Sequence, residues 1–386
     1  MKKSNLIILI LAICCFTLGC AQQFILGVPQ QVADSCGVEL SAIGTLQSTF
    51  GLCNALFTPV MVALSSRMGP KRQLLTGIAL MAAGLAVTSI SDDFGLLVAA
   101  RGVMGVGNGT YVATAYAVAA DIAEPDRKAS AMANVALGFS AASVLAIPVA
   151  RSTADVITWH QGYLVLTVLS VVGFVAISLL VPQLGAEEGD AQPSMSERLA
   201  TLGNRSVLVG LLAIAAMFTA MQATYVYVTP LLEEILPDAA LVSPVMFGIG
   251  LMSLVGAKGG GTLADRIGLA KVLVGSLGMQ VVALAVAAAF VGVPALAVCG
   301  IALWMVGLWA FLPSQNLLLA RAAKGSSNVA VSLSNSCVQL GNAMGSALGG
   351  ALIGVLGVLR LPWVSLAATV VAILLELVAL KAAGER

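Results

Sequence analysis

Three ionisable residues, Arg101, Lys258 and Glu376, interrupt apolar segments of this 386-residue chain. A charge is costly in a lipid environment, so such residues are by default candidates for binding or moving a charged species. A carboxyl group such as that of Glu376 can exchange a proton, and an arginine such as Arg101 can change partners or hold helices together through backbone carbonyls. We therefore treat all three as candidates for ion coupling. The competing interpretations are that Glu376 faces the inner headgroups beside Lys381 and that Lys258 snorkels to the interface.

Neutral polar and aromatic side chains in the apolar segments form a second set. Amide, phenol and indole groups suit an uncharged polar or amphiphilic solute through hydrogen bonds and stacking, and interhelical hydrogen bonding is the alternative role. The candidates for lining a substrate cavity are Gln22, Gln23, Asn108, Tyr111, Asn134, Gln222, Tyr225, Trp304, Gln315, Asn335 and Gln339.

Motifs for catalysis or metal binding are missing from the sequence. The seven cysteines show no CxxC or Cys/His spacing, there is no Walker loop, and the single histidine, His160, lies in a predicted loop. We predict no enzymatic activity, no metal site and no cofactor. The net charge of +1 also gives no reason to expect a nucleic-acid partner.

The composition places these residues in a membrane protein. Hydrophobic residues make up 59% of the chain, charged residues only 10%, and the mean hydropathy is +1.00. Apolar windows of roughly 20 residues, the length that crosses a bilayer as a helix, predict twelve spans. They lie near residues 5–27, 41–63, 73–91, 95–118, 130–151, 161–182, 206–229, 243–262, 270–291, 295–319, 328–353 and 362–381.

A polar stretch between the sixth and seventh spans predicts the domain boundary. It contains Glu187, Glu188, Asp190 and Pro193. The predicted organisation is an N-terminal six-helix bundle, a cytoplasmic linker and a C-terminal six-helix bundle over residues 1–182, 183–205 and 206–386. Lysines and arginines collect in alternate loops, which predicts cytoplasmic termini at both ends of a multi-pass cell-membrane protein.

Two internal matches indicate a duplication. Residues 64–69 and 263–268 spell nearly the same turn, and their arginines, Arg67 and Arg266, are 199 positions apart. Residues 129–142 also align with residues 330–343, which pairs Asn134 with Asn335 at an offset of 201. Two offsets that agree so closely predict parallel six-helix repeats, an arrangement that many transporters use to build a central site.

Several motifs resemble those of the major facilitator superfamily, and within it the twelve-helix bacterial drug and sugar efflux permeases of the proton antiporter type. Residues 261–268 are similar to the front of the family's G-x-L-A-D-R-x-G-R-R loop signature. Residues 101–109 resemble its arginine and glycine motif, and residues 339–350 resemble a glycine-rich stretch of efflux permeases. The resemblance implies an all-α fold of twelve transmembrane helices in two pseudo-symmetric bundles.

The loop signature implies a conformational latch. In the first copy Ser66 replaces the family's acid, so we expect two unequal latches. We expect Asp265 to lie against the start of the fifth span and to pair there with Arg127, because a carboxylate is favoured at a helix N-terminus. The gating candidates are Asp265, Arg266, Gly268, Arg67, Gly69, Arg72 and Arg127.

The resemblance also implies the activity. We expect a secondary active transporter that exports a small neutral or amphiphilic organic solute, such as a sugar, nucleoside or drug-like compound, by alternating access and proton antiport. Its expected partners are this solute, protons and membrane lipid, and we expect a monomer. Gln23 stands where related permeases often carry an acid, and glutamine cannot exchange a proton. An uncoupled facilitator or a non-transporting sensor therefore remains the alternative.

Overall fold

In the computed structural model the described residues form helices joined by short connections, with no strand among them. The described residues are 3–65, 68–124, 127–183, 200–323 and 326–383. The chain divides into two compact units, residues 1–192 and 193–386. The predicted boundaries of the linker stay a prediction, because residues 184–199 lie outside the described ranges.

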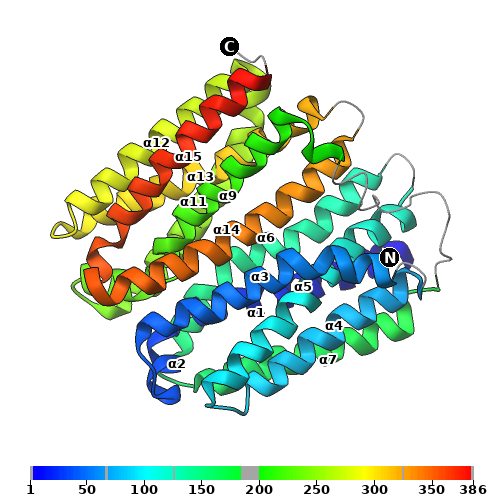
Figure 1. Cartoon of the computed structure of the whole chain (residues 1–386). Helices are drawn as coiled ribbons and strands as arrows, with labels where there is room; N and C mark the ends of the chain where they lie inside the picture. The colour runs from blue at the N-terminus through cyan, green and yellow to red at the C-terminus, as the bar shows by residue number, and fades with distance from the viewer. Residues whose placement is uncertain (1–2, 66–67, 125–126, 184–199, 324–325, 384–386) are drawn as a thin grey trace. The chain divides into compact units, whose positions relative to one another are not determined.

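Each unit contains six long helices (Figure 1). Those of unit 1 are α1 (Lys3–Gln23), α3 (Ile43–Ser65), α4 (Pro70–Thr88), α5 (Phe94–Ile122), α6 (Lys128–Thr153) and α7 (Trp159–Leu180). Those of unit 2 are α9 (Arg205–Tyr225), α11 (Val242–Ile267), α12 (Leu269–Ala289), α13 (Pro294–Ala322), α14 (Ser327–Leu356) and α15 (Leu361–Ala383). At about 1.5 Å per residue, such helices are long enough to cross a bilayer.

The two units share one packing pattern. In unit 1, α1 packs on α6 and α7, α5 packs on α3 and α4, and α4 packs on α7. In unit 2 the corresponding helices make the same pairs: α9 with α14 and α15, α13 with α11 and α12, and α12 with α15. This repetition confirms the predicted all-α fold of two pseudo-symmetric six-helix bundles.

Nine helices in the described part of the chain are long and apolar enough to span a membrane by length and composition alone. The other three long helices are α3, α4 and α5. They occupy the positions that α11, α12 and α13 hold in unit 2, and those three are among the nine. The repeat therefore accounts for the twelve predicted spans.

The duplicated turn recurs in the backbone. Gly69 precedes α4 with φ 79° and ψ 154°, and Gly268 precedes α12 with φ 95° and ψ 148°. Glycine adopts such positive φ values without the steric cost that a side chain would bring. One detail of the sequence prediction was wrong: Asp265 and Arg266 belong to the last turn of α11 rather than to a loop. The three glycines at 259–261 do not end the helix, and α11 continues to Ile267.

Glycines allow close helix contacts in unit 2. A Cβ atom on Gly341, Gly345 or Gly349 of α14 would lie 2.5, 2.4 or 2.2 Å from a backbone carbonyl oxygen of α9. These positions are four residues apart, so they form one face of α14. Small residues at such positions let membrane helices approach closely, and larger side chains there would force α14 and α9 apart.

Two short helices were not predicted. Helix α2 (Pro29–Cys36) follows α1, and α10 (Val228–Ile235) occupies the same place after α9. Each begins within two residues of the end of a predicted span, 5–27 for α2 and 206–229 for α10, where the apolar character of the sequence gives no sign of a break. Their matching positions are a further trace of the duplication.

Candidate functional site

Arg101 is enclosed in unit 1 and is bound at both ends of its guanidinium group. Its side chain lies on α5 and is 1% exposed. Nη1 donates to the backbone carbonyls of Ala21 and Gln22 at 3.2 and 3.4 Å, and Nη2 donates to the hydroxyl of Tyr163. The guanidinium carbon also lies 5.6 Å from the centre of the Tyr163 ring.

This arrangement matches the holding role that the sequence left open for Arg101. The carbonyls belong to the last turn of α1, and Tyr163 belongs to the first turns of α7. The planar guanidinium group can bind several acceptors at once, which a lysine cannot do with the same geometry. Arg101 thereby joins α1, α5 and α7 at one end of the unit, without a carboxylate partner in the described residues.

Glu376 is buried in unit 2. The side chain is 0% exposed on α15, so the interpretation that it faces the lipid headgroups was wrong. Helix α15 packs against α9 and α12, and the carboxyl lies on the side of the helix that these contacts enclose. Arg101 and Glu376 are the two buried charged residues in the described ranges.

The amide of Gln315 on α13 lies beside the Glu376 carboxyl. That amide donates to the Gly210 carbonyl of α9 at 3.2 Å, and its own oxygen has no hydrogen bond in the described structure. Neither carboxyl oxygen of Glu376 reaches hydrogen-bond geometry with a described residue. The junction of α9, α13 and α15 therefore contains a titratable group without a full set of partners.

The gating and coupling candidates outside the buried sites are exposed, apart from Gly69, which is half-buried. Lys258, Asp265 and Arg266 of α11 are exposed, as are Gly268 and Arg72. Arg67 lies outside the described residues. Arg127 forms an exposed ion pair with Glu124 at 3.7 Å. The expected pairing of Arg127 with Asp265 would join the two units and stays a prediction.

The predicted cavity residues divide by burial. Asn134 of α6 and Asn335 of α14 are exposed, and they are the pair that the internal repeat aligns. Gln23, Tyr225 and Gln339 are half-buried. The remaining candidates are buried: Gln22, Asn108, Tyr111, Gln222, Trp304 and Gln315.

Two of these residues lie at contacts between helices. A Cβ atom on Gly77 of α4 would lie 2.8 Å from the backbone nitrogen of Tyr111, so α4 and α5 approach closely at Tyr111. Gln23 donates from Nε2 to the Ser143 hydroxyl at 3.2 Å and so ties α1 to α6. The Gln23 amide, which the sequence analysis named as a candidate for binding substrate, thus donates one hydrogen bond to a neighbouring helix.

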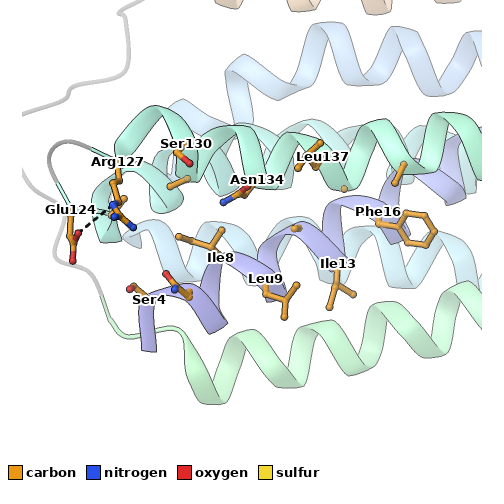
Figure 2. A pocket seen from close by; sticks show the side chains of 16 residues that line it. Ser4, Ile8, Leu9, Ile13, Phe16, Glu124, Arg127, Ser130, Asn134 and Leu137 are labelled. Atoms are coloured by element: carbon orange, nitrogen blue, oxygen red, sulfur yellow. Dashed lines mark ion pairs between the residues drawn. The ribbon is translucent and has the colours of Figure 1, made fainter. Parts of the chain in front are cut away.

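A groove runs between α1 and α6 in unit 1 (Figure 2). It encloses about 890 Å³. Apolar side chains such as Ile8, Ile13 and Leu137 line most of its length, and Asn134 lies among them. The polar end contains Arg127 and Glu124 near the start of α6. A largely apolar cavity with a few polar groups is the usual form of a small-molecule site.

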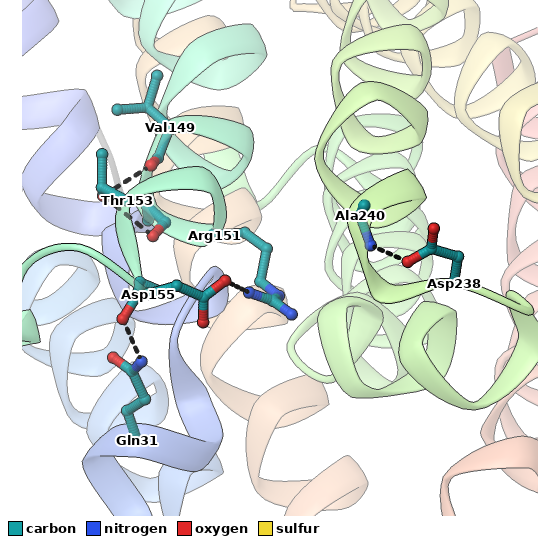
Figure 3. A network of polar contacts seen from close by, with 9 residues as sticks. Gln31, Val149, Arg151, Thr153, Asp155, Asp238 and Ala240 are labelled. Atoms are coloured by element: carbon teal, nitrogen blue, oxygen red, sulfur yellow. Dashed lines mark hydrogen bonds and ion pairs between the residues drawn. The ribbon is translucent and has the colours of Figure 1, made fainter.

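The opposite end of α6 is fastened by polar contacts (Figure 3). Nη1 of Arg151 lies 3.7 Å from Oδ2 of Asp155, which is four residues further along the chain. Nε2 of Gln31 on α2 donates to the Ala154 carbonyl at 2.9 Å. Trp159 adds a bond from its indole nitrogen to the Ser35 hydroxyl at 3.0 Å. Helix α2 is thus attached to the connection between α6 and α7.

The fold and these sites define a multi-pass membrane protein built like a secondary transporter. The chain belongs to the Major Facilitator Superfamily, whose family model matches residues 9–328. It is 30% identical over 375 residues to the uncharacterized MFS-type transporter YbcL of Bacillus subtilis (strain 168), covering 96% of this chain and 94% of the relative.

Two further comparisons bear on fold and function. The chloramphenicol resistance protein of Streptomyces lividans is 27% identical over 262 residues, which covers 67% of this chain and 66% of that protein. The crystal structure of a bacterial homolog to the human lysosomal transporter Spinster aligns with a TM-score of 0.76 at 12% identity, covering 100% of this chain and 98% of the other. This structural similarity supports the fold alone.

Some contacting residues were not found from the sequence. Tyr163 lies in an apolar segment, and its hydroxyl becomes significant only when α7 meets α5. Ser4, Glu124 and Ser130 line the groove although α1 and α6 are far apart in the sequence. A signal existed for the last two, because they flank Arg127 closely in the chain, but neither residue type marks a cavity by itself.

Proposed function

We propose that this protein exports a small organic solute across the cell membrane by alternating access, coupled to proton entry. Export is supported by the similarity to a chloramphenicol resistance protein. Alternating access is supported by the two repeated bundles, because transporters built from such repeats rock one bundle against the other around a central site. We further propose that both termini are cytoplasmic, in line with the distribution of lysine and arginine.

The observation that carries proton coupling is the environment of Glu376. Its carboxyl is enclosed, lies beside the amide of Gln315, and forms no ion pair in the described residues. The charged side chains on the neighbouring helices, Arg205 of α9, Lys271 of α12 and Arg321 of α13, are exposed. Gain or loss of a proton would change the charge of this junction by one unit, so its preferred packing would depend on protonation.

The uncoupled facilitator is the second candidate function, and one observation favours it. Gln23 replaces an acid and is already bonded to Ser143, while Arg101 is held by carbonyls and Tyr163. If Glu376 serves packing alone, the described spans contain no other buried carboxyl to move a proton.

Everted membrane vesicles can separate the two functions. Uptake of a sugar, a nucleoside and a cationic dye would be measured with and without an imposed proton gradient, in the wild type and in Glu376→Gln. Glu234→Gln is the matched control, because Glu234 is an exposed acid outside the junction. We expect gradient-dependent uptake that Glu376→Gln abolishes and Glu234→Gln retains. Uptake that ignores the gradient in the wild type would reject proton coupling.

A further inference from the structure

The groove between α1 and α6 has an asymmetric lining. One end is polar and charged, and the rest of its length is apolar. Ile13 and Leu137 present apolar surface to the space, with 52% and 63% of these residues exposed. Figure 2 shows Ile8, Leu9, Ile13 and Phe16 projecting from α1 and Leu137 lying on α6. An elongated or flat apolar group would bury this surface.

The charged end is suited to an anion. Helix α6 begins at Lys128, and its N-cap residue, Arg127, makes no side-chain capping bond. The first amide groups of a helix lack intrahelical partners and carry partial positive charge, which favours a carboxylate or phosphate. The Arg127 guanidinium lies at the same end, and the Ser130 side chain is one turn further along α6.

The present partner of Arg127 can be displaced. Its ion pair with Glu124 is 3.7 Å long, and the two side chains are 73% and 54% exposed. Such exposed pairs contribute little to stability, so an incoming anion can compete for the guanidinium. Glu124 then acts as an internal competitor that limits the affinity for an anion.

Asn134 distinguishes a solute from ordinary membrane lipid. Its side chain is exposed and lines the groove. An amide facing hydrocarbon tails would remain unsatisfied at a cost of several kcal/mol. The position is therefore suited to an occupant with a polar group partway along its body, or to a water-filled path that such an occupant enters.

We propose that the groove binds an amphiphilic organic anion as the transported solute, with its carboxylate or phosphate at Arg127 and its apolar body between α1 and α6. This proposal rests on the proposed export function and narrows its substrate class. A neutral sugar or nucleoside would bring no charge to replace Glu124 beside Arg127. A cation would meet the positive end of α6 and Arg127.

Binding of fluorescent probes to the full chain in phosphatidylcholine nanodiscs tests this. The probes are 11-(dansylamino)undecanoate, its uncharged methyl ester and the amine analogue, which share one body and differ at the head. We expect the carboxylate to bind about tenfold more tightly than the ester, as the loss of a charge-assisted hydrogen bond implies. The amine should bind most weakly.

Variants that should change carboxylate affinity in opposite directions provide a second test. Arg127→Gln should weaken carboxylate binding about tenfold and leave ester binding unchanged, whereas Glu124→Gln should strengthen carboxylate binding because it removes the competitor. Leu137→Trp should weaken all three probes by filling the groove. Arg205→Gln is the matched control, an exposed arginine at the start of α9. Thermal unfolding curves would verify that each variant is folded.

Three results would overturn the proposal. One is equal affinity of the wild type for carboxylate and ester. Another is carboxylate binding that Arg127→Gln leaves unchanged. The third is a phospholipid that copurifies, is lost in Arg127→Gln and is not displaced by the carboxylate, which would make the occupant a lipid. Gradient-driven export of a neutral solute without probe binding would reject this inference and leave the proposed function standing. Probe binding without any export would do the reverse.

Discussion

Within the described residues, each six-helix unit encloses one charged side chain, and the surroundings of the two differ. Arg101 in unit 1 has three acceptors within reach, two of them backbone carbonyls that cannot move without distorting α1. Glu376 in unit 2 has one amide nearby and no completed hydrogen bond in the described structure. A satisfied charge stabilises one arrangement of helices, whereas an unsatisfied one can favour different arrangements according to its protonation.

The positions of the two residues along their helices differ as well. Arg101 lies in the second turn of α5 and meets the end of α1, at the end of unit 1 opposite to the start of α6. Glu376 lies two turns before the end of α15, near the beginning of α9 where Gly210 accepts from Gln315. The duplication that repeats the helices and the turns has therefore not repeated the buried charges. Function in this family of folds can reside in such departures from symmetry.

Replacing Arg101 should have the largest effect. Arg101→Ala leaves two carbonyls and the Tyr163 hydroxyl without their donor in a buried site, and we expect a loss of about 3–5 kcal/mol of stability. The measurement is the yield and thermal midpoint of the protein in detergent. Arg101→Lys should recover part of this stability, because it restores charge without the planar fork. An unaltered midpoint in Arg101→Ala would show that these contacts do not hold the helices.

Glu376→Gln should change transport and spare folding. The amide is similar in size and carries no charge, so we expect a thermal midpoint at or slightly above that of the wild type, together with loss of gradient dependence. Unfolding curves and vesicle uptake would be measured on the same preparations. If Glu376→Gln lowered the thermal midpoint strongly and left gradient dependence intact, Glu376 would have a structural role like that of Arg101 and no role in coupling.

Tyr163→Phe isolates one contact of the Arg101 site. The change removes the hydroxyl that accepts from Nη2 and keeps the ring beside the guanidinium, so we expect a loss of about 1–2 kcal/mol. Thermal unfolding of Tyr163→Phe, Arg101→Ala and the double variant would form a double-mutant cycle. Strictly additive losses would mean that the two side chains do not interact.

Among the substitutions expected to destabilise the protein, Gln315→Leu should cost the least stability. It removes one bond to the Gly210 carbonyl, which corresponds to about 1 kcal/mol. Its effect on transport should be larger than this loss suggests, since Glu376 loses its polar neighbour. The pH profile of uptake would be compared with that of wild type, and an unchanged profile would separate Gln315 from the coupling site.

The sequence was sufficient where a local pattern fixes local structure. Apolar segments of membrane-crossing length predicted the twelve long helices, and the repeated turn predicted a conformation that recurs at Gly69 and Gly268. It was less reliable where a helix has no clear end. Asp265 and Arg266 were assigned to a loop because they are polar, yet the hydrogen bonds of α11 continue to the next glycine.

The sequence alone determined that this chain is a duplicated bundle of membrane helices. Hydropathy, the spacing of glycines and the constant offset between repeated segments are all properties of the linear sequence. Only the tertiary structure decided which way each polar side chain points. Burial of Glu376, capture of Arg101 by Tyr163 and exposure of Asn134 each depend on contacts between helices distant in the sequence. In helices that are apolar on nearly every face, periodicity gives no direction, so the neighbouring helices determine it.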